Sequence, residues 1–164
     1  LSPGYALAHN NLAASLERDG RLEEALAHYR TALDLAPGLA EAGSNAGHLL
    51  VRLGRPGEGL TLLRELVETH PRSANVLYAM AEALDRSGRA DDALPFVEQV
   101  REIDPRYPAA HYLLGKIHYE RGDEAVAAES MRRFLELWSG EGEHAEAARR
   151  IIARVEGGAR APGT

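Results

Sequence analysis

The sequence predicts an all-α fold of stacked helical hairpins, and three observations carry that prediction. Glycines, prolines and small residues each recur with a spacing of about 34 residues, which is the period of helical-hairpin repeats. The series are Gly20, Gly54, Gly88 and Gly122; Pro37, Pro71 and Pro105; and Ala25, Gly59, Ala93 and Ala127. Aromatic residues make up only 5% of the chain, and Ala and Leu dominate the apolar set. This composition favours closely packed helices over a β-sheet.

The composition also argues against several classes of protein. A formal net charge of -6 disfavours a nucleic-acid partner, which would need clustered Lys and Arg. The absence of cysteine excludes disulfides and thiolate metal sites. No apolar run approaches the ~18 residues of a membrane span, and no signal-peptide pattern opens the chain. We therefore expect a soluble protein without membrane insertion, with the cytoplasm favoured and the periplasm left open.

The first repeat shows why each repeat should form two helices. Leu7, Leu12 and Leu16 recur at helical spacing and predict the apolar face of the first helix. Gly20 ends this helix, because glycine can adopt the left-handed conformation found at helix ends. Pro37 stops the second helix, since proline cannot continue it.

Small residues occupy one shared position in the first helix of every repeat. These residues are Ala13, Gly47, Ala81 and Gly115. Side chains this small let the axes of two helices approach toward the short end of the usual ~8–10 Å range. The second repeat carries three glycines, including Gly43 and Gly59, within its expected helices. Each costs roughly 0.5–1 kcal/mol relative to alanine, which predicts a soft hairpin.

At these positions the chain resembles the tetratricopeptide repeat family. The resemblance implies a right-handed α-solenoid of four helix pairs followed by a C-terminal capping helix. The expected segments are the tail of a preceding repeat (1–5), four repeats (6–39, 40–73, 74–107 and 108–141), a capping helix (142–156) and a disordered tail (157–164). The opening segment reads like the end of the first repeat, so we expect the chain to continue a longer one.

The chain carries no recognisable catalytic or cofactor motif. The serine at position 44 lacks the strand that precedes a nucleophile elbow, and the glycines from Gly54 to Gly59 lack the lysine of a phosphate loop. His9, His111 and His118 occupy positions that ordinarily pack rather than bind metal. We therefore expect neither an enzyme nor a bound cofactor or metal.

The resemblance implies that the first helices line a concave groove, which in this family usually holds an extended peptide or a helix. The groove residues carried over to this chain are Asn10, Asn11, Ser44, Asn45, His48, Arg52, Tyr78, Glu82, Tyr112, Lys116 and Tyr119. Asn11 and Asn45 share one repeat position, and an amide there can donate to and accept from a peptide backbone. Tyr78 and Tyr112 share another, and tyrosine often anchors binding surfaces.

The charge pattern of these residues disfavours one binding mode of the family. Members that hold the acidic C-terminal tails of heat-shock chaperones use a clamp of lysines, arginine and asparagines. Asn45 fits one clamp position, but Asn10 and Ala14 stand where that clamp has lysine and asparagine. One repeat after Asn45, its lysine and arginine positions hold Asn75 and Ala79. An uncharged or modestly amphipathic peptide is therefore the expected ligand.

Three functions remain open from the sequence. The first is a non-catalytic scaffold for protein–protein interaction, with a peptide or helix in the groove. The second is a substrate-presenting module of a larger enzyme, because the first two repeats resemble arrays attached to glycosyltransferases and sulfotransferases. The third is self-assembly into a homo-oligomer, favoured if Leu7 and Leu12 form an exposed apolar face.

Overall fold

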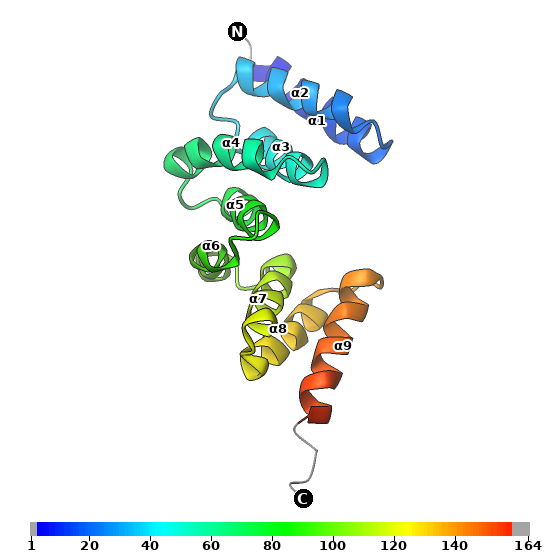
Figure 1. Ribbon diagram of the computed structural model, residues 1–164. Helices are drawn as coiled ribbons and strands as arrows, with labels where there is room; N and C mark the ends of the chain where they lie inside the picture. The colour runs from blue at the N-terminus through cyan, green and yellow to red at the C-terminus, as the bar shows by residue number, and fades with distance from the viewer. Residues whose placement is uncertain (1–2, 159–164) are drawn as a thin grey trace, which may run out of the picture. The chain divides into compact units, whose positions relative to one another are not determined.

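The computed structural model describes residues 3–158, and within this range the chain forms nine helices and no strand (Figure 1). The helices are α1 (Pro3–Arg18), α2 (Leu22–Leu35), α3 (Ala40–Arg52), α4 (Pro56–Thr69), α5 (Ala74–Arg86), α6 (Ala90–Ile103), α7 (Pro108–Arg121), α8 (Glu124–Leu137) and α9 (Glu143–Gly158). The predicted all-α fold class is confirmed.

The chain forms two compact units, which divide between Phe96 and Val97 inside α6. Unit 1 ends at Phe96 and unit 2 begins at Val97. Pro95 lies inside α6 just before this division, where its ring removes one backbone hydrogen-bond donor from the helix.

Both ends of the described range differ from the sequence prediction. Helix α1 begins at Pro3, within the segment expected to be the tail of a preceding repeat. Helix α9 continues through Gly157 to Gly158, two positions expected to be disordered. The remainder of the predicted tail, residues 159–164, lies outside the described residues, as do residues 1–2.

The turn inside each helix pair depends on a glycine with a positive φ. The values are 77° at Gly20, 73° at Gly54, 73° at Gly88 and 84° at Gly122. Non-glycine residues rarely adopt this left-handed conformation, which lets the amide after each glycine return to a carbonyl of the preceding helix. At the first turn, for example, the amide of Arg21 donates to the carbonyl of Leu16 over 2.9 Å. The predicted role of these glycines is confirmed.

The core of unit 1 forms between neighbouring helices of the stack. Helix α1 packs on α2, and α3 packs on α2, α4 and α5. One cluster of buried side chains joins the first three helices and includes Leu16, Leu26, Tyr29 and Leu49, all at most 6% exposed. Small residues such as Ala13 complete this cluster, as the sequence predicted.

The predicted apolar face of α1 is only partly buried. Leu16 is covered, but Leu7 and Leu12 each remain 46% exposed. Ala46 and Met80, which stand one and two repeats after Leu12, are 0% and 5% exposed. The physical reason is position in the stack, because α3 and α5 also pack on the second helix of the preceding pair, α2 and α4 respectively.

The glycines of α3 make room for the leucines of α4. A Cβ atom added at Gly43 would lie 2.0 Å from Cδ1 of Leu66, and one at Gly47 would lie 2.8 Å from Cδ1 of Leu63. Both leucines are at most 3% exposed. The expectation of a soft hairpin considered only the conformational cost of glycine, and it omitted the volume of Leu66 that fills the space beside Gly43. Gly59 differs, since its added Cβ would meet only ordinary contacts at 3.4 Å and beyond.

Unit 2 contains the helix pair α7–α8 and the terminal helix α9, which packs on α8. Met131 lies against Gly115, where an added Cβ would be 3.0 Å from its Cγ atom. Met131, Phe134 and Ala148 form the buried cluster that joins α8 to α9. Arg149 on α9 is exposed, at the position that Ala or Gly holds in the four repeats.

We expect Gly43→Ala and Gly59→Ala to change stability in opposite directions. Gly59→Ala should raise the free energy of unfolding by roughly 0.5–1 kcal/mol, because alanine costs less than glycine inside a helix. Gly43→Ala should lower it by about 1 kcal/mol or more, because the added methyl group must displace the buried Leu66. Urea titrations followed by circular dichroism would measure both values. A stabilising effect of Gly43→Ala would contradict the packing account.

Candidate functional site

The polar side chains expected to line a groove on α1, α3 and α5 are largely engaged with one another. Asn10 is 1% exposed; its amide donates to Glu41 over 3.0 Å and its oxygen accepts from Asn45 over 3.3 Å. Ser44 is 2% exposed, and its hydroxyl donates to the carbonyl of Ala40 over 2.9 Å. Asn10 and Ser44 are therefore structural, and the expectation that they face a ligand is corrected. The Asn45 amide donates to the buried Asn10, and Asn45 itself is half-buried.

A second group links α1, α2 and α3 around the carboxylate of Glu17. The phenol of Tyr29 donates to Oε2 of Glu17 over 3.1 Å, and Arg52 of α3 forms an ion pair with the other carboxylate oxygen. Tyr29 is only 1% exposed. Burial raises the pKa of its phenol well above the ordinary value, and the nearby negative charge of Glu17 raises it further. The phenol therefore stays protonated and donates its hydrogen bond to Glu17 on α1.

A third group links α3 to α5. His48 Nδ1 donates to the carboxylate of Glu82, and the His48 ring lies 5.6 Å from the ring of Tyr78. His48, Tyr78 and Glu82 are all half-buried, so part of each remains accessible. The His48–Glu82 and Glu17–Arg52 pairs join positions 34 and 35 residues apart, so neighbouring repeats fix one another's side chains.

The accessible residues on this side of unit 1 form what we call the first-helix surface. It consists of Asn11, His48, Arg52, Tyr78 and Glu82. Tyr29 and Glu41 were not among the predicted site residues, although their hydrogen bonds to Glu17 and Asn10 help to hold this surface in place. Glu17 and Arg52 stand 35 residues apart, close to one repeat, and this spacing is the sequence signal that indicates their pairing.

The expected groove residues of unit 2 lie on α7. The ring of Tyr112 packs edge-on against Phe134 of α8 and His144 of α9, with centroids 5.2 and 4.6 Å away. Tyr112 therefore packs between α7, α8 and α9, and its side chain is only partly accessible to a ligand. The Nζ atom of Lys116 lies 3.4 Å from Oε1 of Glu120, and Tyr119 is half-buried.

The histidines singled out in the sequence are engaged in local contacts. His111 is 6% exposed and its Nε2 donates to the carbonyl of Pro105 over 2.9 Å. His9 and His28 share a hydrogen bond of 2.9 Å between their Nδ1 atoms, and His118 contacts Asp123 at 3.0 Å. Within residues 3–158, no group of three or more His, Asp or Glu side chains could hold a metal ion.

The repeat positions, the turn glycines and the paired helices together point to one family. The sequence profile of the tetratricopeptide repeat matches residues 16–83, 50–117 and 86–133, which span more than half of the chain. The chain belongs to the tetratricopeptide repeat family. Repeats of this family form protein-interaction modules that bind peptides or proteins and are generally non-catalytic.

Solved structures of other proteins share this fold, and they include two tetratricopeptide repeat proteins, TTC0263 and YrrB. TTC0263, a thermophilic protein of Thermus thermophilus, superposes with a TM-score of 0.78 at 21% identity, over 94% of this chain and 83% of that one. YrrB, a TPR protein with an unusual peptide-binding site, superposes with a TM-score of 0.68 at 21% identity. The match covers 94% of this chain and 77% of YrrB. A fragment of MamA from Desulfovibrio magneticus RS-1, residue 41 to the end, superposes with a TM-score of 0.69 at 21% identity. The match covers 80% of this chain and 75% of that fragment. At these identities the likeness shows the fold alone.

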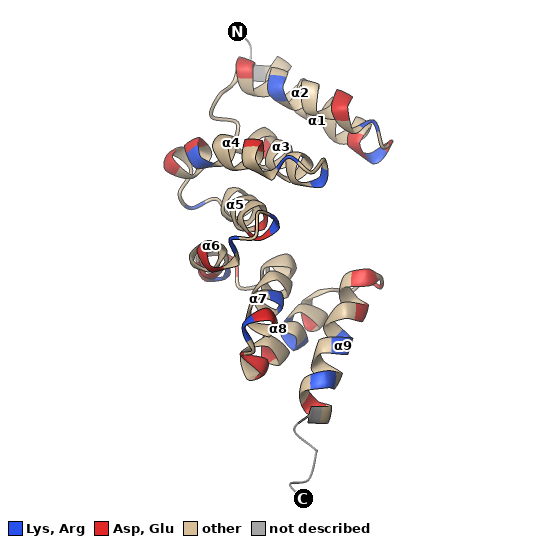
Figure 2. Cartoon of the chain, viewed as in Figure 1, with Lys and Arg blue, Asp and Glu red and all other residues tan. Residues whose placement is uncertain are grey.

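No curated protein matches the sequence significantly. Within residues 3–158, no helix of this tetratricopeptide repeat protein is both long and apolar enough to span a lipid bilayer. Acidic and basic residues are interspersed along the helices of each unit (Figure 2).

We expect the effect of Tyr29→Phe on stability to depend on pH. At pH 8 the variant should lose about 1 kcal/mol of unfolding free energy, because the hydrogen bond to Glu17 is gone. Above about pH 10 the phenol ionises in the unfolded chain while burial keeps it protonated in the folded one. The wild type therefore loses stability as pH rises, and the difference between the two proteins should narrow by pH 11. Urea titrations at both pH values would measure it.

The matched control is Tyr5→Phe, because Tyr5 is 68% exposed. This variant should unfold at the same urea concentration as the wild type at either pH. A difference between Tyr29→Phe and wild type that stays constant from pH 8 to pH 11 would contradict the assigned burial of the phenol.

Proposed function

We propose that this tetratricopeptide repeat protein is a non-catalytic scaffold that binds a peptide or a helix along the first-helix surface. The observation that carries the proposal is the mutual fixation of these side chains by the Glu17–Arg52 and His48–Glu82 pairs of neighbouring repeats. Side chains already held in place lose little conformational freedom when a ligand binds. The entropy cost of ordering them therefore offsets less of the interaction free energy. Lys116 and Tyr119 are proposed as ligand contacts within unit 2, taken by itself.

The chemistry of the first-helix surface favours a ligand with polar and apolar groups mixed. Tyr78 offers an aromatic face with a polar tip, Arg52 is half-exposed although paired with Glu17, and Glu82 pairs with His48. A strongly acidic ligand would meet carboxylates beside each cation. We propose no nucleic-acid partner, because the charges alternate in sign and the net charge is -6.

Tyr78→Ala should weaken peptide binding about tenfold or more. Aromatic anchors at interfaces often contribute about 2 kcal/mol or more, and about 1.4 kcal/mol already corresponds to a factor of ten. Twelve-residue peptides selected from a phage-displayed random library on the immobilised chain would serve as probes. Their affinities for wild type and variant would be measured by isothermal titration calorimetry.

Arg89→Ala is the matched control, because Arg89 is exposed, pairs with Asp92 and lies outside the first-helix surface. It should leave affinity unchanged. Equal affinities for wild type, Tyr78→Ala and Arg52→Ala across the selected peptides would reject the first-helix surface as the binding site.

Self-assembly is a second candidate, favoured by the 46% exposure of Leu7 and Leu12 on α1. Burial of two leucines between copies would stabilise a dimer. Light scattering at two protein concentrations should then show a mass that rises with concentration, and Leu12→Gln should abolish that rise. A monomeric mass at both concentrations would exclude this candidate.

The proposal of a substrate-presenting module within a larger enzyme stays open beside the scaffold. It rests on the likeness of the first two repeats to arrays attached to glycosyltransferases and sulfotransferases. The open reading frame around Leu1 and Thr164 would decide it, since a neighbouring catalytic domain would be encoded there.

A further inference from the structure

A continuous groove lies between α2 and α4, the second helices of the first two pairs in unit 1. Two hollows of about 520 and 500 Å³ follow each other there. Leu33, Asp34, Leu62 and Glu65 line both hollows, so the two are parts of one depression. We call it the α2–α4 groove. It is distinct from the first-helix surface, whose residues lie on α1, α3 and α5.

The floor of the α2–α4 groove is apolar. Leu33 of α2 and Leu62 of α4 are half-buried and rest against the core of unit 1. Leu50 of α3 lines one hollow and Leu66 of α4 the other, and both are buried. The floor therefore offers leucine surface that the folded unit leaves partly exposed, and apolar side chains of a ligand could cover it favourably.

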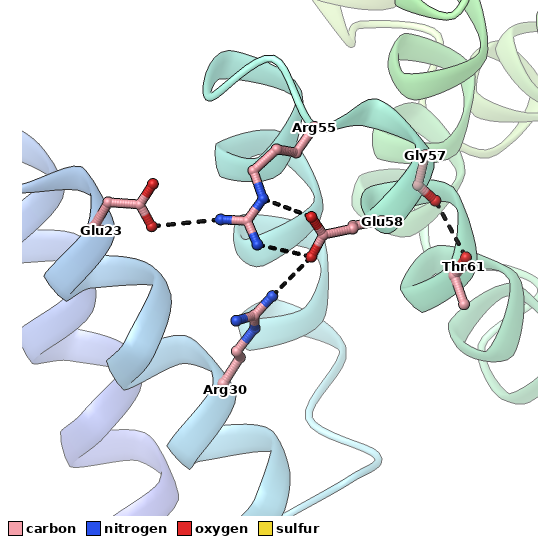
Figure 3. A network of polar contacts seen from close by, with 6 residues as sticks. All are labelled: Glu23, Arg30, Arg55, Gly57, Glu58 and Thr61. Carbon is pink, nitrogen blue, oxygen red and sulfur yellow. Dashed lines mark hydrogen bonds and ion pairs between the residues drawn. The ribbon is translucent and has the colours of Figure 1, made fainter.

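An ion-pair network holds α2 and α4 together at one end of the groove (Figure 3). Arg55 donates to both carboxylate oxygens of Glu58 at 2.6 and 2.8 Å, and Arg30 of α2 donates to the same carboxylate at 3.1 Å. Arg55 also reaches Glu23 of α2 at 3.4 Å. The hydrogen bonds from Arg55 lower the pKa of Glu58, so this carboxylate stays ionised and already has cationic partners.

The remaining carboxylates of the groove have no such partners. Asp34 of α2 and Glu65 of α4 are exposed and line both hollows from opposite helices. Among the described residues, neither side chain forms an ion pair or a hydrogen bond. The only cation lining the groove, within the same residues, is Arg30, which pairs with Glu58. The groove thus combines a leucine floor with two unpaired negative charges.

We propose that the α2–α4 groove binds a short basic, amphipathic segment of a partner protein. Its apolar side chains cover Leu33 and Leu62, and a Lys or Arg lies between Asp34 and Glu65. An acidic segment is repelled by these two carboxylates, and an uncharged one would desolvate them without a compensating partner. A cation beside an apolar side chain satisfies both features, and a phosphate backbone satisfies neither.

A pair of designed peptides tests the proposal. The probe is a 14-residue fluorescent peptide of leucine and lysine with leucines at helical spacing, and its counterpart carries glutamate in place of every lysine. Titration into the isotopically labelled chain, followed by nuclear magnetic resonance, should shift the amide signals of α2 and α4 with the lysine peptide only. The affinity should fall as salt is added, because the rim charges are exposed.

The double variant Asp34→Asn/Glu65→Gln should weaken binding of the lysine peptide roughly three- to tenfold, as expected when two exposed ion pairs are lost. Both residues are exposed, so the fold should be unchanged by circular dichroism. The control Glu141→Gln/Glu146→Gln removes the same charge from exposed positions outside the groove and should change affinity less than about twofold.

Three results would overturn the proposal. The lysine peptide does not bind, or its signal shifts concentrate on α1, α3 and α5, or both double variants weaken it equally. Shifts confined to the helices of the first-helix surface would instead support the proposed function, so the two proposals can fail separately.

Discussion

The close approach of paired helices is the constraint on which the rest of unit 1 depends. Leu63 and Leu66 of α4 lie directly on the backbone of α3, where Gly47 and Gly43 leave no side chain in the way. A methyl group at either glycine would enter the space of a buried leucine, since protein interiors are packed to crystal-like density. This contact fixes the separation of α3 and α4, and through α3 it positions the first-helix surface on one side and the α2–α4 groove on the other.

Because the helices stack at a fixed repeat, polar side chains of neighbouring repeats can meet at a fixed offset. Glu17 and Arg52 stand 35 residues apart, and His48 and Glu82 stand 34 apart. The buried Asn10 is satisfied by Glu41 and Asn45 in the same way. No buried side-chain nitrogen or oxygen lacks a hydrogen-bond partner within the described residues. These pairs stabilise the stack and also hold the surface that a ligand would meet.

The elements predictable from the sequence were those that depend on local chemistry. Gly20 and its three counterparts predicted the turns, because only glycine readily adopts their positive φ. The packing of the Leu66 side chain into the space beside Gly43 was not predictable, because these residues are far apart in the sequence and meet only in the folded protein. The burial of Asn10 and the packing of Tyr112 against α9 were missed for the same reason. Positions carried over from a family indicate which helix face a residue occupies, but its neighbours decide whether it stays accessible.

The two sides of unit 1 therefore differ in how their charges are disposed. On the first-helix side, the carboxylates of Glu17 and Glu82 already contact Arg52 and His48, so a ligand there meets side chains that are held in place and paired in charge. On the second-helix side, Asp34 and Glu65 lack such contacts within the described residues, and a cation meets them without displacing a protein group. Paired groups held in place favour ligands of matching shape, whereas unpaired carboxylates favour ligands of positive charge. One helical stack can in this way select two partners of different chemistry.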